Sequence, residues 1–109
     1  MPHIIVEYSP QLDDKIPALL NELHESLSAS GIDKVRIKTR GIALNHSVVG
    51  LEGTSGLMMH ATLLILEGRS YEVKKQYGDP LHDLLKKAAP DNCAVTLEVR
   101  DMDKETYYL

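Results

Sequence analysis

The sequence predicts an α+β domain in which two β-α-β units build one four-stranded sheet with two helices on one of its faces. Four apolar segments show the patterns of strands, at residues 4–8, 35–44, 57–66 and 95–100, and leave a tail at 101–109. One amphipathic helical pattern separates the first two strands, and another separates the last two. Right-handed connections would place both helices on the same face of the sheet.

The composition is that of a single globular domain spanning residues 1–109. Packing must rest on Leu, Ile and Val, because the chain contains neither Phe nor Trp. The formal net charge of −4 argues against a nucleic-acid surface, which needs a basic excess. Cys93 is the single cysteine, no apolar run is as long as a membrane span, and the first residues lack a signal-peptide pattern. We therefore expect a cytoplasmic domain that binds neither nucleic acid nor membrane.

The first β-α-β unit begins with the strand at residues 4–8, whose two apolar faces favour a central place in the sheet. Ser9-Pro10 is expected to cap the following helix. Pro17 is tolerated if the regular helix begins near Asp14, and Gly31 is expected to end it. The apolar residues of this helix share one stripe, formed by Leu12, Ile16, Leu19, Leu20, Leu23 and Leu27.

The second strand, predicted at residues 35–44, carries a row of cations. Alternation places Arg36, Lys38 and Arg40 on one face of this strand. The row is either a solvated rim, which is the usual place of a charged strand face, or one wall of an anion site. Residues 45–56 are rich in Gly, Ser and Thr and are expected to form a loop.

The second β-α-β unit begins with the strand at residues 57–66, which is apolar on both faces and therefore central. Ser70 is expected to cap the next helix. Gly78-Asp79-Pro80 interrupts the pattern of that helix and predicts a kink or a break. The face of the sheet opposite the helices would expose apolar residues such as Ile5 and Leu64, which predicts an oligomer.

The N-terminal pair Met1-Pro2 suggests a catalytic group carried by the backbone. A small second residue such as proline permits removal of Met1, which would leave a free secondary amine at the tip of the first strand. An α-amine titrates closer to neutrality than lysine, and burial or nearby cations lower its pKa further. Pro2 would then be a general base. The alternative is that Pro2 merely begins the strand, where a missing N–H is tolerated.

The histidines do not predict a metal site. Their spacing does not match that of metal ligands, and the five residues are His3, His24, His46, His60 and His82. No cofactor is predicted, and His60, beside the third strand, is a candidate for lining a substrate pocket.

Three segments carry a family resemblance. They are Met1 to Ser9 (MPHIIVEYS), Ser30-Gly31-Ile32 followed by Ile37 to Arg40 (IKTR), and His60 to Ser70 (HATLLILEGRS). The chain resembles the tautomerase superfamily, and within it the 5-carboxymethyl-2-hydroxymuconate isomerase family, over nearly its whole length. The resemblance implies a tautomerase-like fold, a homotrimer, and a cofactor-independent isomerase of aromatic catabolism. Such an enzyme converts a 2-hydroxymuconate-type dienol dicarboxylate to its unsaturated 2-oxo isomer.

Position by position, the resemblance implies that Pro2 is the base that moves the proton from oxygen to carbon. Arg69 would bind the 2-oxo acid end of the substrate and stabilise charge developing on its oxygen. Lys38 aligns with an arginine of the family and Arg40 is a second basic position, so either could be the further anion-binding residue. Lys38 would replace a bidentate clamp by a point charge. We assign Pro2, Arg69 and Arg40 to catalysis, and Lys38 and His60 to substrate binding.

The charge distribution agrees with these roles, because an acidic protein must concentrate cations locally to bind an anion. Such cations would lower the pKa of Pro2 and stabilise an enolate-like transition state. For Arg36, however, the solvated rim remains the favoured interpretation.

Two alternatives stay open, one within the superfamily and one from a different class of function. A decarboxylase or a broad-specificity tautomerase of the same superfamily would use the same amine and the same cations. A ferredoxin-like ligand-binding module shares the β-α-β order but has no catalysis, and it would need neither a processed Pro2 nor Arg69.

Overall fold

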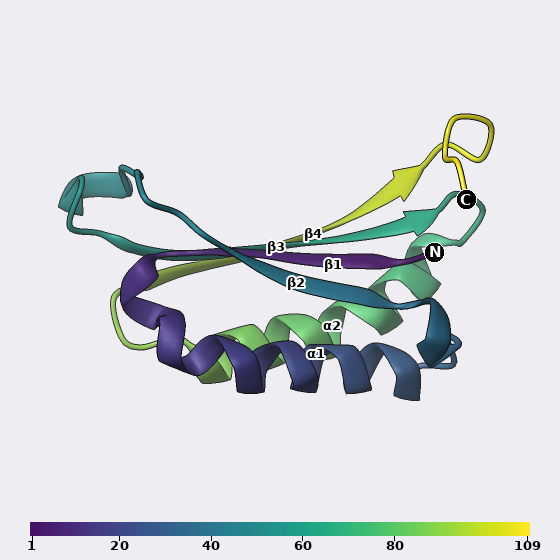
Figure 1. The fold of residues 1–109 in the computed structure, drawn as a ribbon, viewed down its shortest axis with the longest axis horizontal. Helices are drawn as coiled ribbons and strands as arrows, with labels where there is room; N and C mark the ends of the chain where they lie inside the picture. Colours follow the sequence, from purple (N-terminus) through teal and green to yellow (C-terminus); the bar gives the residue numbers. More distant parts are fainter.

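The structure is a computed structural model that describes all residues from Met1 to Leu109. Its main elements are β1 (His3–Tyr8), α1 (Ile16–Ala29), β2 (Lys38–Ala43), β3 (Leu57–Leu66), α2 (Tyr71–Ala88) and β4 (Cys93–Met102). Short 3-10 helices lie at Pro10–Lys15 (η1), Lys34–Arg36 (η2) and Gly50–Glu52 (η3). The strand order is β2-β1-β3-β4, with parallel pairs at the two edges and an antiparallel pair in the centre (Figure 1). The predicted α+β fold of two β-α-β units is confirmed.

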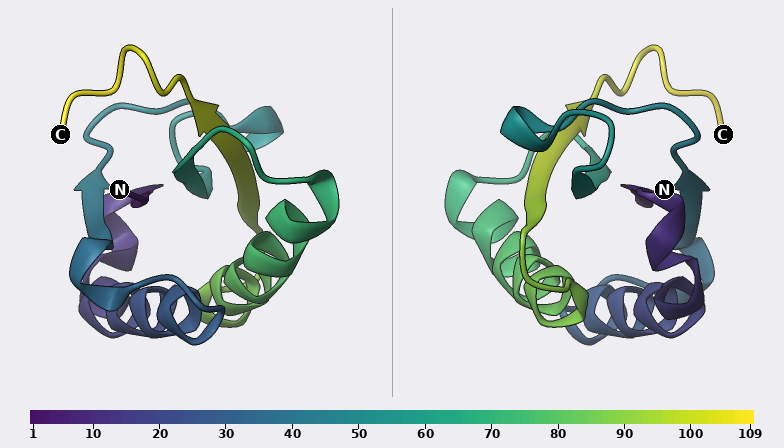
Figure 2. Two further views of the ribbon diagram at one scale, coloured as in Figure 1. Left: turned by 90° about the vertical axis from the view of Figure 1, so that its right-hand side faces the viewer. Right: turned by 90° about the vertical axis from the view of Figure 1, so that its left-hand side faces the viewer.

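Both helices cover the same face of the sheet, and the core lies between these two layers (Figure 2). Alternation along β1 and β3 turns every second side chain toward the helices. The fully buried side chains include Ile4, Val6, Met59, Leu63 and Ile65 from the strands, and Leu19, Leu23, Leu27, Leu81 and Leu85 from the helices. Each such aliphatic side chain contributes roughly 1.5–3 kcal/mol through burial. Neither helix combines the length and the hydropathy that crossing a membrane requires.

The helix ends follow the sequence with one exception. Pro17 lies in the first turn of α1, and Gly31 follows the end of that helix with a φ of 104°, a conformation that glycine adopts without strain. Ser70 caps α2, since its hydroxyl accepts a hydrogen bond from the Val73 N–H at 3.2 Å. The capping prediction for Ser9 is wrong, because its hydroxyl accepts from the Met58 N–H at 2.9 Å and so ties the chain to β3.

The second strand is shorter than predicted and begins at Lys38 instead of residue 35. The Asp33 carboxylate accepts a hydrogen bond from the Val35 N–H at 3.2 Å and folds the preceding residues into η2. A short acidic side chain stabilises such a turn because it bonds to the backbone two residues ahead. The alternation of β2 therefore begins only after Arg36. Arg36 does not belong to the row of cations that was predicted to include Lys38.

The break predicted as one possibility at Gly78-Asp79-Pro80 does not occur, because α2 runs without interruption from Tyr71 to Ala88. Packing against β4 holds the helix together. A side chain at Gly78 would place its Cβ 3.2 Å from Cγ2 of Val99, so glycine permits the close approach. Pro80 lies on the exposed side, where it removes one helical hydrogen bond without disturbing the core.

No helix or strand of the chain covers the face of the sheet opposite the helices (Figure 2). Ile5 and Leu64 are half-buried on this face, and Ile42 is 47% exposed. We name this surface the open face. Polar side chains of β1, β2 and β3, including His3, also lie there.

Replacement of Pro80 by alanine tests the account of α2. Pro80→Ala restores an N–H in the middle of the helix, so the free energy of unfolding should rise by about 1–3 kcal/mol. Denaturant unfolding at a fixed protein concentration measures the change. Asp83→Ala, also on the exposed side of α2, is the control and should change the free energy little. An unchanged or lower stability of Pro80→Ala would contradict the account.

Candidate active site

The antiparallel pairing of β1 and β3 brings distant segments to one end of the sheet. His3 pairs with Leu64 near the end of β3, and on its other side with Lys38 at the start of β2. The turn before β2 and the turn between β3 and α2 therefore flank the start of β1. Both termini lie at this end of the sheet (Figure 1).

A cavity of about 380 Å³ opens beside the start of β1. Its wall combines the two N-terminal residues with the α1–β2 turn, the end of β3 and the first turns of α2, and includes Pro2, Asp33, Arg36, Arg69 and Tyr77. The volume lies within the range of small-molecule sites. Pro2 is buried, and the N–H of Lys38 donates to its carbonyl oxygen at 3.1 Å, which fixes the residue at the strand tip.

Arg69 reaches the cavity from the junction between β3 and α2. Its Nη1 donates to the carbonyl oxygen of Leu66 at 3.2 Å, and its Nε donates to the Tyr77 hydroxyl at 3.4 Å. The guanidinium also lies 5.8 Å from the centre of the Tyr77 ring, a cation–π arrangement. A guanidinium has five N–H donors, so further N–H groups remain for an anionic ligand.

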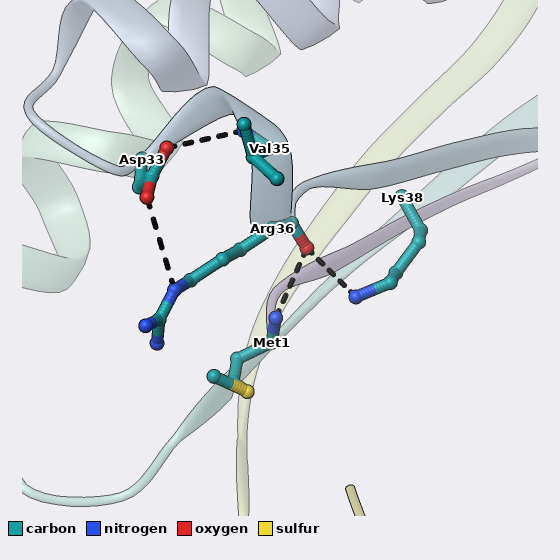
Figure 3. A network of polar contacts seen from close by, with 5 residues as sticks. All are labelled: Met1, Asp33, Val35, Arg36 and Lys38. Carbon is teal, nitrogen blue, oxygen red and sulfur yellow. Dashed lines mark hydrogen bonds and ion pairs between the residues drawn. The ribbon is translucent and has the colours of Figure 1, made fainter.

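Arg36 lines the same cavity, although the sequence favoured a solvated rim for it. Its Nε lies 3.9 Å from the Asp33 carboxylate (Figure 3). Both side chains are more than half exposed, so this ion pair contributes little to stability. Asp33 is the residue in the sequence that could have revealed the position of Arg36. An acidic residue that starts a turn delays the start of the following strand, so Arg36 lies before the strand and outside its alternation.

Two positively charged groups converge on the carbonyl oxygen of Arg36 (Figure 3). The Met1 amine donates to this oxygen at 3.0 Å, and the Lys38 ammonium donates to it at 2.9 Å. Burial lowers the pKa of the Met1 amine, and the hydrogen bond and charge of Lys38 and the charge of Arg36 lower it further. An amine at this end of β1 is therefore biased toward its neutral, basic form.

Arg40 and His60 do not line this cavity. Arg40 donates from Nη1 to Nδ1 of His3 at 3.0 Å on the open face. His60 is bonded to Thr96 at 2.7 Å and pairs with Glu7, five positions beyond Pro2 and so about 16 Å along the strand. The structure thus brings Pro2 and Arg69 to one cavity, and Lys38 lies next to Pro2 without lining that cavity. The roles assigned to Arg40 and His60 remain predictions.

The arrangement suits proton transfer on a small anion. Two guanidinium groups line a cavity that also contains the start of β1, where cations favour a neutral amine. No cluster of three or more His, Cys, Asp or Glu side chains is placed to share a metal ion.

Comparisons with known proteins agree with this chemistry. A family model described as 5-carboxymethyl-2-hydroxymuconate isomerase matches residues 2–108. A search among curated proteins returned no match. Among solved structures, a 5-carboxymethyl-2-hydroxymuconate isomerase from Deinococcus radiodurans R1 is 27% identical, with a TM-score of 0.88 over 99% of this chain and 87% of that chain.

Two more distant structures share the fold. A 5-carboxymethyl-2-hydroxymuconate delta-isomerase is 20% identical, with a TM-score of 0.75 over 100% of this chain and 87% of that chain. The W0 fused 4-OT wild-type symmetric trimer is 15% identical, with a TM-score of 0.77 over 94% of this chain and 88% of that chain. At these identities the likeness shows a tautomerase-type fold and nothing further.

The family assignment rests on the family model, which spans nearly the entire sequence. It supports an isomerase or tautomerase function, in agreement with a cavity lined by cations at the start of β1. The chain belongs to the 5-carboxymethyl-2-hydroxymuconate isomerase family.

Proposed function

We propose that this chain isomerises a 2-hydroxymuconate-type dienol dicarboxylate, such as 5-carboxymethyl-2-hydroxymuconate, to its unsaturated 2-oxo isomer. The Pro2 amine is the general base, and no cofactor takes part. One observation carries the proposal: Pro2 is buried at the tip of β1 and lines the same cavity as the guanidinium groups of Arg36 and Arg69.

The reaction moves one proton. The neutral Pro2 amine accepts the proton of the 2-hydroxyl group, and the resulting ammonium returns a proton to a carbon of the conjugated chain. Negative charge grows on the substrate oxygen between these two steps. Arg69 binds the adjacent carboxylate and stabilises that charge with the N–H groups that its bonds to Tyr77 and Leu66 leave free. Arg36 supplies a second positive charge on the cavity wall.

Removal of Met1 is a condition of this mechanism, because Pro2 is an amide while Met1 is attached. The amine of Met1 shows what the surroundings do to a free amine there, since burial, Lys38 and Arg36 all lower its pKa. Cleavage moves the amine one residue inward to Pro2, which is buried and bonded to the backbone of Lys38. The same influences then act on the catalytic base.

The functional assembly that we propose is a homotrimer. The fused 4-OT structures similar to this chain include symmetric and asymmetric trimers, and the open face leaves Ile5, Ile42 and Leu64 uncovered within one chain. His60 also lies on the open face, so its assigned role would be played in the cavity of a neighbouring subunit.

The main test is a spectrophotometric enol-to-keto assay on protein whose intact mass shows the chain starting at Pro2. We expect turnover of 5-carboxymethyl-2-hydroxymuconate that exceeds turnover of simple 2-hydroxymuconates. Arg69→Ala should lower kcat/KM by about 10²–10³-fold, because it removes the donors that face the developing oxyanion. The kcat/KM of Arg69→Lys should lie between the values of the unmodified protein and of Arg69→Ala, since a point charge replaces a bidentate clamp.

Lys87→Ala provides the matched control for Arg69, because Lys87 is exposed in the last turn of α2. Its kcat/KM should equal that of the unmodified protein. Full activity in protein that retains Met1 would refute Pro2 as the base, and unchanged turnover by Arg69→Ala would remove Arg69 from the site.

The pH dependence of kcat/KM tests the cations around the amine. Activity should fall as the pH drops through the pKa of Pro2, which should lie below the value of about 8 for an ordinary α-amine. Lys38→Gln should move this acidic limb to higher pH, because one charge that disfavours the ammonium is lost. Arg36→Gln should move it less. The control is Lys34→Gln, which removes a cation of the same turn that is paired with Glu25; an equal shift there would contradict the assignment.

Sedimentation equilibrium tests the assembly. The expected species has three times the 12.1 kDa mass of the chain. Ile42→Glu should dissociate it, because a carboxylate would be buried on the open face, whereas Lys87→Glu on α2 should not. A single-chain mass for the unmodified protein at micromolar concentration would rule the trimer out.

A further inference from the structure

The C-terminal tail returns to the start of β1 and is held there by specific bonds. After β4 it crosses toward the N-terminus beyond the end of the sheet (Figure 2). The Glu67 carboxylate accepts from the N–H of Lys104 at 2.8 Å, and Asp103 closes a turn by accepting from the N–H of Tyr107 at 3.0 Å. Glu67 belongs to the junction that also carries Arg69, so the tail and Arg69 share one anchoring segment.

A row of three polar side chains runs from β2 through β1 to this tail. Nη1 of Arg40 lies 3.0 Å from Nδ1 of His3, and Nε2 of His3 lies 2.8 Å from the Tyr107 hydroxyl. The imidazole and the phenol ring also meet edge to face, with centroids 5.9 Å apart. The row ends at Met1, whose carbonyl oxygen lies 3.5 Å from the Tyr107 hydroxyl.

The groups at the two ends of this row determine which atom donates and which accepts in each of its hydrogen bonds. Arg40 can only donate, so Nδ1 of His3 must accept, and a neutral imidazole then carries its proton on Nε2 and donates to Tyr107. Burial, with the charges of Arg40, Lys38 and the N-terminal amine, lowers the pKa of His3 and favours this neutral form. Since the Tyr107 oxygen accepts from His3, its own proton is available, and a carbonyl oxygen can only accept it.

The Met1 oxygen marks a position that matters once Met1 is gone. In any peptide the carbonyl oxygen lies about 2.3 Å from the following nitrogen, here that of Pro2. A substrate oxygen whose proton is taken by the Pro2 amine lies about 2.7–3.0 Å from that nitrogen, in the space that Met1 leaves. The Tyr107 hydroxyl lies 3.5 Å from the Met1 carbonyl oxygen and is therefore close to the space where the reacting oxygen would lie.

We propose that Tyr107 is a further catalytic residue, whose hydroxyl donates a hydrogen bond to the substrate oxygen from which Pro2 takes the proton. His3 and Arg40 are positioning residues that act through Tyr107. This proposal rests on the proposed function, because it needs a free Pro2 amine and an enol substrate. It gives Arg40 a role within its own chain, although its side chain lies outside the cavity.

The proposal gives the charged and the neutral hydrogen-bond donors different positions around the substrate oxygen. Arg69 and Arg36 lie on the cavity wall, whereas Tyr107 does not line the cavity and reaches its edge from the tail, at the Met1 carbonyl oxygen. Charge that develops on the oxygen would therefore be stabilised from two directions, by a guanidinium and by a neutral donor. The electron pair of the O–H bond stays on that oxygen until the 2-oxo group forms, and the proton passes to Pro2 and then to carbon.

Tyr107→Phe tests the hydroxyl in protein that starts at Pro2. With 5-carboxymethyl-2-hydroxymuconate as substrate, kcat should fall by about 10–100-fold while KM changes less than threefold, because the hydrogen bond strengthens as charge develops. The control is Tyr108→Phe, which removes a neighbouring hydroxyl whose side chain is 89% exposed. Its kcat should equal that of the unmodified protein.

A double-variant cycle separates the positioning role of His3 from a general effect on folding. His3→Leu should lower kcat by a similar factor, His3→Gln should retain much of it, and adding Tyr107→Phe to His3→Leu should cost little more. An active unmodified enzyme in which Tyr107→Phe and Tyr108→Phe behave alike would overturn the role of Tyr107 and leave the proposed function standing. An unmodified enzyme without turnover would overturn both.

Discussion

The antiparallel pairing of β1 with β3 is the constraint on which the site depends. Each β-α-β unit alone contributes one parallel strand pair and one helix, and the central pairing joins the two units into one sheet. It also reverses one unit relative to the other, so the first strand starts where the third one ends. Pro2 and Arg69 are far apart in the sequence and meet at one cavity for this reason alone. A register slip of one residue would turn every core side chain of β1 to the open face.

Cations are concentrated at this meeting point although the chain carries a net charge of −4. Arg36 and Lys38 come from the connection into β2 and Arg69 from the junction between β3 and α2, and only Arg36 has a carboxylate, Asp33, as a partner within 4 Å. Positive charge that is not neutralised disfavours a protonated amine and favours a bound anion, so both requirements of the proposed reaction are met by the same groups. A carboxylate paired with each of these cations would neutralise the positive charge that lowers the pKa of the amine and attracts the anion.

The strands, the helices and the candidate base could be predicted from the sequence, because periodicity and short motifs are local. The stripe of α1 and the cap at Ser70 are examples. What failed depends on tertiary structure. Packing of Gly78 against β4 carries α2 through Pro80. Alternation along the chain also does not show that Asp33 folds residues 34–36 into η2, so Arg36 was placed with Arg40 on one strand face. The contact of His3 with Tyr107 joins residues 104 positions apart and has no local signal.

Met1 has two opposite consequences for the same site. Its peptide bond converts the Pro2 nitrogen into an amide, and its carbonyl group fills the space beside that nitrogen and accepts from the Tyr107 hydroxyl. While Met1 is attached, the Tyr107 hydroxyl already has an acceptor and the row from Arg40 is complete. Cleavage removes this acceptor and exposes the amine in one step, so the base and the donor become available together. A donor that is prearranged by His3 and Arg40 needs no reorganisation when the substrate oxygen arrives, and this is the condition under which a hydrogen bond is most effective in catalysis.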